Sequence, residues 1–68
     1  MQVGDMVKYR PNEQPSKPYG DPSDVGVVIR VSKYGRSATV QWAMSGIRYS
    51  EWTHLMDRDW ETKWTWGK

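Results

Sequence analysis

Short runs in which apolar and polar residues alternate constrain this chain more than any other feature of its sequence. Three such runs follow one another between residues 25 and 50, and only a few residues separate each run from the next. Alternation with a period of two is typical of β-strands that bury one face. Consecutive strands joined by short turns pair as an antiparallel meander. The sequence therefore predicts an all-β fold.

The strand predicted over residues 25–33 has the strongest pattern. Its predicted inward face carries every second residue, namely Val25, Val27, Ile29 and Val31. Its predicted outward face carries the residues between them, namely Gly26, Val28, Arg30 and Ser32. The return strand is expected to bury Ala38, Val40 and Trp42, and residues 47–50 alternate again. A further strand within residues 3–10 turns Val7 and Tyr9 inward.

The segments between these strands carry the residues that turns require. Residues 11–24 hold all four prolines and form a long loop, because proline lacks a backbone N–H and cannot extend a strand. Residues 34–37 form a hairpin turn in which Gly35 takes a positive φ. Residues 43–46 form a second tight turn. Residues 51–53 are predicted as a one-turn helix and residues 54–57 as the last strand, although the spacing of Trp52, Leu55 and Met56 leaves a longer helix open.

Composition limits what this fold can be built from and where it can work. A chain of 68 residues has room for one domain, and its five Trp and four Tyr supply the large buried area that a small core needs. It has no Cys and one His, so neither disulfides nor a metal site are expected. No apolar stretch approaches the length of a membrane span, and the N-terminus lacks the apolar core of a signal peptide. We therefore expect a cytoplasmic protein without cofactors.

Several of these motifs together resemble the SH3-like small barrels. The resemblance rests on Gly4 to Tyr9, the long loop, Gly26-Val27-Val28, the hairpin, Val40-Gln41-Trp42 and the turn at Gly46. It covers residues 1–58 as one domain and leaves residues 59–68 as a Trp-rich C-terminal extension. Within that group the chain is most similar to short SH3-like proteins of tailed bacteriophages, and more loosely to KOW and Tudor modules. The resemblance implies a five-stranded barrel with a one-turn helix before the last strand, and a non-catalytic adaptor in the host bacterial cytoplasm.

The sequence favours a binding protein over an enzyme. The only histidine, His54, has no glycine-rich nucleophile turn near it, and the six glycines are isolated from one another. Type II dihydrofolate reductases also use an SH3-like barrel and carry a Val-Gln-x-Tyr segment, but the equivalent residues 47–50 read Ile-Arg-Tyr-Ser. No small-molecule substrate is therefore expected.

Two binding sites are predicted. The first is a surface for a protein partner or for self-association, formed by the clustered tryptophans and the hairpin tip, namely Trp60, Trp64, Trp66, Tyr34 and Arg36. The alternative for the three tryptophans is that they fold back and complete the core.

The second predicted site is a basic face for nucleic acid. Seven Lys or Arg stand against four acids in residues 1–50, and the candidates are Lys8, Arg10, Arg30, Lys33, Arg36 and Arg48. Ordinary solubility charge is the competing explanation. Trp42, Tyr49 and Trp52 could also form a Tudor-like aromatic cage, although the alternation favours Trp42 in the core.

Overall fold

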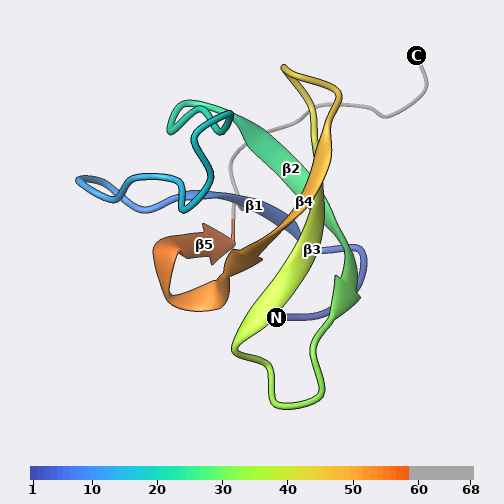
Figure 1. Cartoon of the computed structure of the whole chain (residues 1–68). Helices are drawn as coiled ribbons and strands as arrows, with labels where there is room; N and C mark the ends of the chain where they lie inside the picture. Colours follow the sequence, from blue (N-terminus) through green and yellow to red (C-terminus); the bar gives the residue numbers. More distant parts are fainter. Residues whose placement is uncertain (59–68) are drawn as a thin grey trace.

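The computed structural model describes residues 1–58 and contains one antiparallel sheet. Its strands are β1 (Met6–Tyr9), β2 (Val25–Val31), β3 (Ser37–Trp42), β4 (Arg48–Trp52) and β5 (Met56–Arg58). A single 3-10 turn, η1 (Thr53–Leu55), joins β4 to β5. The strands lie in the order β4-β3-β2-β1-β5, so the first strand pairs with both the second and the last (Figure 1). The prediction of an all-β fold is confirmed for this part of the chain.

The last predicted elements are displaced along the sequence. The short helix lies at Thr53–Leu55 instead of residues 51–53, and β5 begins at Met56. The reason is that β4 continues through Trp52 with strict alternation, so Glu51 is buried in a strand and does not open a helix. The predicted extension, residues 59–68, lies outside the described residues.

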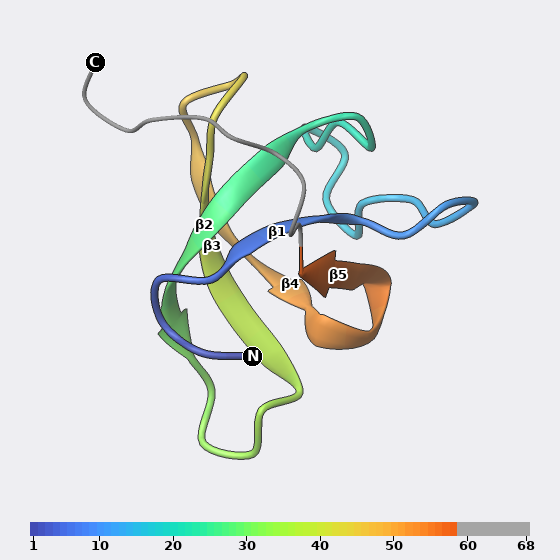
Figure 2. The ribbon, with the colours of Figure 1, turned by 180° about the vertical axis from the view of Figure 1, so that it is seen from behind.

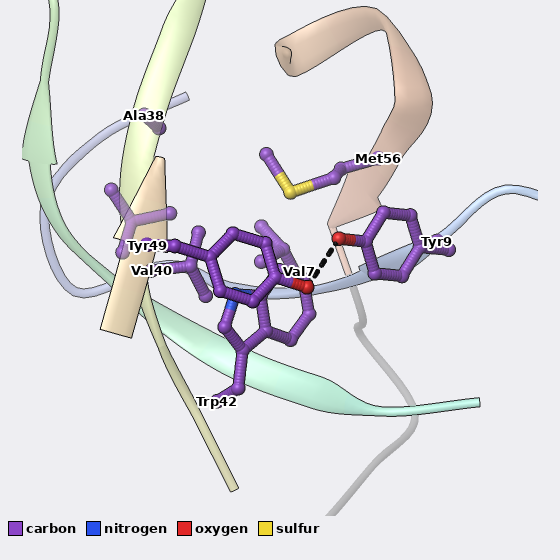
Figure 3. Packing of buried hydrophobic residues seen from close by; sticks show 8 residues of the cluster. Val7, Tyr9, Ala38, Val40, Trp42, Tyr49 and Met56 are labelled. Atoms are coloured by element: carbon purple, nitrogen blue, oxygen red, sulfur yellow. Dashed lines mark hydrogen bonds between the residues drawn. The ribbon is translucent and has the colours of Figure 1, made fainter. Parts of the chain in front are cut away.

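The core is small and rests on three stacked aromatic rings. Trp42 packs against both Tyr9 and Tyr49, with ring centroids 4.9 Å from the first and 5.4 Å from the second (Figure 3). The aliphatic part consists of the remaining buried apolar residues, namely Val7, Val28, Ala38, Val40 and Met56. The predicted inward residues of the first and third strands are therefore confirmed. Rings of this size bury about 150–250 Å² each, which explains how so short a chain forms a core.

The predicted faces of β2 are wrong over residues 26–29, whereas Arg30 is outward and Val31 packs against the core as predicted. Gly26 and Val28 point into the core, whereas Val27 is only half-buried and Ile29 is exposed. Val28 pairs with Val40 and Arg30 pairs with Thr39, so Ile29 is an extra residue in a β-bulge. The bulge turns Arg30 outward and returns Val31 to the inner side. The inward position of Gly26 also has a steric cause, since a Cβ there would meet the Val40 side chain and would lie 2.7 Å from the Gln41 carbonyl oxygen.

The long loop of residues 11–24 projects from one end of the sheet (Figures 1 and 2), yet it is anchored to the core. The ring of Tyr19 meets that of Tyr49 edge to face, with centroids 5.3 Å apart. Gly20 lies so close to the core that a Cβ there would be 2.6 Å from the Tyr49 hydroxyl. The loop therefore has a defined position over the aromatic core.

Replacing Gly26 with alanine should destabilise the fold. The added methyl group would collide with backbone as well as with Val40, and overpacking of this kind costs about 1–3 kcal/mol. For a domain of this size, the midpoint of thermal unfolding should fall by about 4 °C or more, as followed by circular dichroism.

Gly35→Asn is the matched control for this substitution. Gly35 has a φ of 71° and open space around its Cα, and asparagine tolerates left-handed backbone. An unchanged midpoint for Gly26→Ala, or an equal loss in both variants, would contradict the close approach of β2 and β3.

Candidate functional site

The outward side of β2, β3 and β4 is a polar surface without acidic side chains. Across the three strands Arg30 pairs with Thr39, which in turn pairs with Ser50. The flanking rows pair Gln41 with Arg48 and Ser37 with Trp52. We call this surface the outer face, and its residues are Val27, Arg30, Ser37, Thr39, Gln41, Arg48, Ser50 and Trp52.

Hydrogen bonds fix the side chains along this face. Arg48 Nε donates to Gln41 Oε1 at 3.1 Å, and Gln41 Nε2 donates to the Gly46 carbonyl at 2.9 Å, so the turn after β3 orients the guanidinium. The hydroxyls of Thr39 and Ser50 lie 3.0 Å apart. Arg48 and Trp52 are four residues apart on one strand and so lie about 13 Å apart. The face therefore carries a cation at one end and an aromatic ring at the other.

Two adjoining depressions cross the outer face. The larger has a volume of about 270 Å³ and is lined by Arg30, Ser32, Ser37, Ala38, Thr39 and Ser50. The smaller has a volume of about 130 Å³, and we call it the Lys17–Trp52 cleft; it is lined by Ser16, Lys17, Ser37, Ser50, Glu51 and Trp52. Ser37 and Ser50 line both depressions, so the two adjoin, and we call them together the groove. The Trp52 side chain lines the smaller depression and is half exposed.

The carboxylate of Glu51 lies beneath the cleft and binds both the long loop and the end of β4, which line it. Glu51 Oε2 accepts hydrogen bonds from the Tyr9 hydroxyl at 2.8 Å and from the Ser16 N–H at 2.9 Å. Glu51 Oε1 accepts one from the Trp52 N–H at 2.9 Å. Burial opposes ionisation, but these hydrogen bonds outweigh it and hold the pKa of Glu51 below its ordinary value of 4.5. The loop that carries Lys17 and the strand end that carries Trp52 are thus held by one charged group.

The Tyr9 hydroxyl extends this network into the core. It lies 2.8 Å from the Tyr49 hydroxyl (Figure 3), and burial together with that hydrogen bond and the bond to Glu51 raises the pKa of Tyr9 far above its ordinary value. Both phenols therefore stay protonated and can donate hydrogen bonds at every physiological pH.

A second buried acid, Asp24, supports the opposite end of the outer face, where Gln41 and Arg48 lie. It accepts hydrogen bonds from the backbone N–H groups of Val25 at 2.8 Å and Met44 at 2.9 Å, with a longer contact to Ser45. It thereby joins the end of the long loop to the β3–β4 turn, which in turn supports Gln41 and Arg48. A buried acid therefore supports each end of the outer face, Glu51 near Trp52 and Asp24 near Arg48.

The arrangement of charges leaves the surface more basic than the sequence suggests. Residues 1–58 contain eight Lys or Arg and six acids, but Asp24 and Glu51 are buried. Two more acids form ion pairs on the surface, Asp57 with Arg10 at 2.9 Å and Asp5 with Arg58 at 3.5 Å. Five of the other cations make no ion pair within the described residues, and they are Lys17, Arg30, Lys33, Arg36 and Arg48.

The structure divides the predicted basic residues into three groups. Arg30 and Arg48 share the outer face, whereas Lys8 and Arg10 lie at the β1–β5 edge beside an open depression. Lys33 and Arg36 flank the hairpin tip, where Lys33 Nζ lies 5.6 Å from the centre of the exposed Tyr34 ring. All six are exposed, but they do not form one surface.

The other predicted site residues have different outcomes. Trp42 and Tyr49 are buried in the core while Trp52 points outward, so these three rings do not form an aromatic cage. Trp60, Trp64 and Trp66 lie outside the described residues, and their role stays a prediction.

Lys17 and Glu51 are functional candidates that the sequence did not single out, and Trp52 was predicted only as part of an aromatic cage. The sequence pattern that could have placed Trp52 and Glu51 is the alternation of β4, which extends past residue 50. It turns Arg48, Ser50 and Trp52 outward and Tyr49 and Glu51 inward. The position of Lys17 had no such signal, because it depends on how the long loop packs.

Comparison with known proteins identifies no relative. No family model, no curated protein and no solved structure matches the chain. Within residues 1–58 no helix is long and apolar enough to cross a membrane, and no group of three potential metal ligands occurs. What this chain does must therefore be inferred from its own surface.

Glu51 should make the stability of the fold depend on pH. Because its pKa is lower in the folded state than in the unfolded state, the unfolded chain binds the proton more readily as the pH falls below about 4.5. The stabilisation is complete above that pH and is lost at lower pH. Glu51→Gln, which removes the charge, should lower the free energy of unfolding by about 1–3 kcal/mol at pH 7 and by less at pH 3.

Urea denaturation of both proteins at the two pH values measures this effect. Glu13→Gln is the control, since the Glu13 side chain makes no hydrogen bond or ion pair with the described residues. A Glu51→Gln variant as stable as the wild type at pH 7 would show that the network is not needed.

Proposed function

We propose that the chain is a non-catalytic nucleic-acid-binding module that contacts phosphates with its outer face. We propose further that its sheet closes as an SH3-like small barrel. The strand order, with β1 between β2 and β5 and a 3-10 turn between β4 and β5, supports this fold. Such a barrel would present the outer face as a curved, rigid platform.

The observation that carries the function is the composition of the outer face. Arg30 and Arg48 point outward on the same face as a half-exposed Trp52, and no acidic side chain points outward from that face. Single-strand-binding surfaces combine cations that follow the backbone with aromatic rings that stack on bases. Hydroxyl groups such as those of Thr39 and Ser50 also donate to phosphate oxygens.

Ordinary solubility charge would distribute cations and acids together over the surface. Here Glu51 beneath the cleft and Asp24 at the opposite end of the outer face are both buried, and internal donors occupy both of them. The net charge of the whole chain is only +2, so the long-range field is weak. We expect affinities in the micromolar range or weaker, which is typical of binding dominated by a few phosphate contacts.

The prediction of a protein-binding adaptor has less support from the described residues. Its tryptophans lie beyond residue 58, and its hairpin-tip residues Tyr34 and Arg36 are exposed. The similarity to bacteriophage proteins likewise stays a prediction, on which neither the fold nor the comparisons bear.

The double variant Arg30→Gln/Arg48→Gln should weaken binding to a labelled oligonucleotide and make it less sensitive to salt. For single strands, each lost phosphate contact reduces the slope of log K against log salt by about 0.7, so two contacts reduce it by about 1.4. Fluorescence anisotropy at several salt concentrations measures both quantities.

Arg10→Gln is the control for this experiment, because Arg10 is paired with Asp57 away from the outer face. If the double variant and the wild type have equal salt slopes, the outer face does not bind phosphate. Absence of binding to any oligonucleotide at low salt would overturn the proposed function itself.

A further inference from the structure

The geometry of the Lys17–Trp52 cleft points to a specific ligand. We propose that this cleft receives one unpaired base of a single-stranded RNA, while the rest of the groove holds the ribose and phosphates that follow it. This inference rests on the proposed function and adds the class of nucleic acid and the position of the base.

The walls of the cleft suit a flat aromatic ligand. Trp52 offers a half-exposed indole on one side, and Lys17 stands on the loop that forms the other side. The volume of about 130 Å³ is large enough for a single ring system and too small for a stacked pair of bases. Bases within a duplex are stacked and paired, so only a strand with splayed bases can place one there.

The charge of the cleft favours a base over a phosphate. The carboxylate of Glu51 is buried beneath the cleft, and its negative charge would repel a phosphate placed above it. The Glu51 oxygens are already bonded to Ser16, Trp52 and Tyr9, so the carboxylate needs no ligand donor. The phosphates then belong at the neighbouring cations, which are Lys17 among the residues that line the cleft and Arg30 in the larger depression.

The hydroxyl groups of the groove favour RNA over DNA. Ser37 and Ser50 line the boundary between the cleft and the larger depression, and Ser32 and Thr39 continue the row towards Arg30. A ribose 2′-hydroxyl both donates and accepts hydrogen bonds, and it is the group that distinguishes RNA from DNA at a protein surface. A row of hydroxyls, which have the same dual capacity, lies where the sugar next to a bound base would be.

The cleft is also built before any ligand arrives. Glu51 accepts from Ser16 with one oxygen and from Trp52 with the other, so the two walls are fixed relative to each other. Walls that need no reordering reduce the entropic cost of binding a flexible strand. Glu51 is therefore a positioning residue for this site.

The test compares three ligands by fluorescence anisotropy. They are a labelled single-stranded RNA of about ten nucleotides, the same sequence as DNA, and the RNA annealed to its complement. The full chain should bind the single-stranded RNA most tightly. Trp52→Ala should weaken that binding between about fivefold and more than a hundredfold, the range for loss of one stacked base, while leaving duplex binding unchanged.

Two further variants keep the result interpretable. Lys17→Gln tests the opposite wall and should weaken binding of the single strand, even if Trp52→Ala were to unfold the domain. Met44→Ala removes an exposed apolar side chain at the β3–β4 turn and should change nothing. Circular dichroism of each variant checks that the fold is intact.

The outcomes separate this inference from the proposed function. If Arg30→Gln/Arg48→Gln weakens binding but Trp52→Ala and Lys17→Gln do not, the outer face binds nucleic acid and the base cleft is wrong. Equal affinity for duplex and single strand would also overturn the cleft, and equal affinity for DNA would overturn the assignment to RNA. If none of the three ligands binds at low salt, both proposals fail.

Discussion

The hydrogen bonds to the buried carboxylate of Glu51 are the interaction on which the rest of the structure depends. They connect β1 through Tyr9, the long loop through Ser16 and the start of η1 through Trp52. Tyr9 and Ser16 lie more than thirty positions before Glu51 in the sequence. An ionised group with no such partners would be strongly unfavourable in a core. The network therefore makes the folded arrangement specific as well as stable.

The same strand builds the core and the candidate binding face. The inward side of β4 supplies Tyr49 and Glu51, and its outward side supplies Arg48, Ser50 and Trp52. A slip of one residue in the pairing with β3 would exchange these two sets. The buried charge prevents that slip, because the exchange would bring Arg48 and Trp52 inward and leave Tyr9 without its acceptor. The position of the interface is thus determined by the packing beneath it.

Much of the fold follows from alternation in the sequence, and the exceptions have physical causes. Val7, Tyr9, Val40 and Trp42 were placed correctly because polar residues stand between them. In β2 the valines at positions 27 and 28 are adjacent, so alternation alone does not show which of them points inward. Only a glycine fits at position 26 against Val40 and Gln41, and this places Gly26 and Val28 on the inner side. For the candidate site, the outward positions of Arg30 and Arg48 were predictable. The cleft was not, because it requires a loop to dock through Ser16 onto a residue 35 positions further along the chain.

The bulge in β2 shows how one residue can change the shape of a protein without changing its chemistry. In the ladder to β3, Ile29 stands between the paired residues Val28 and Arg30 and has no partner of its own. A strand lacking Ile29 would still turn Val28 inward, Arg30 outward and Val31 inward. It would lose only the local twist and bend that a bulge adds. The curvature of this small sheet, and with it the hollow in which Arg30 stands, is therefore encoded by the length of a strand as well as by its side chains.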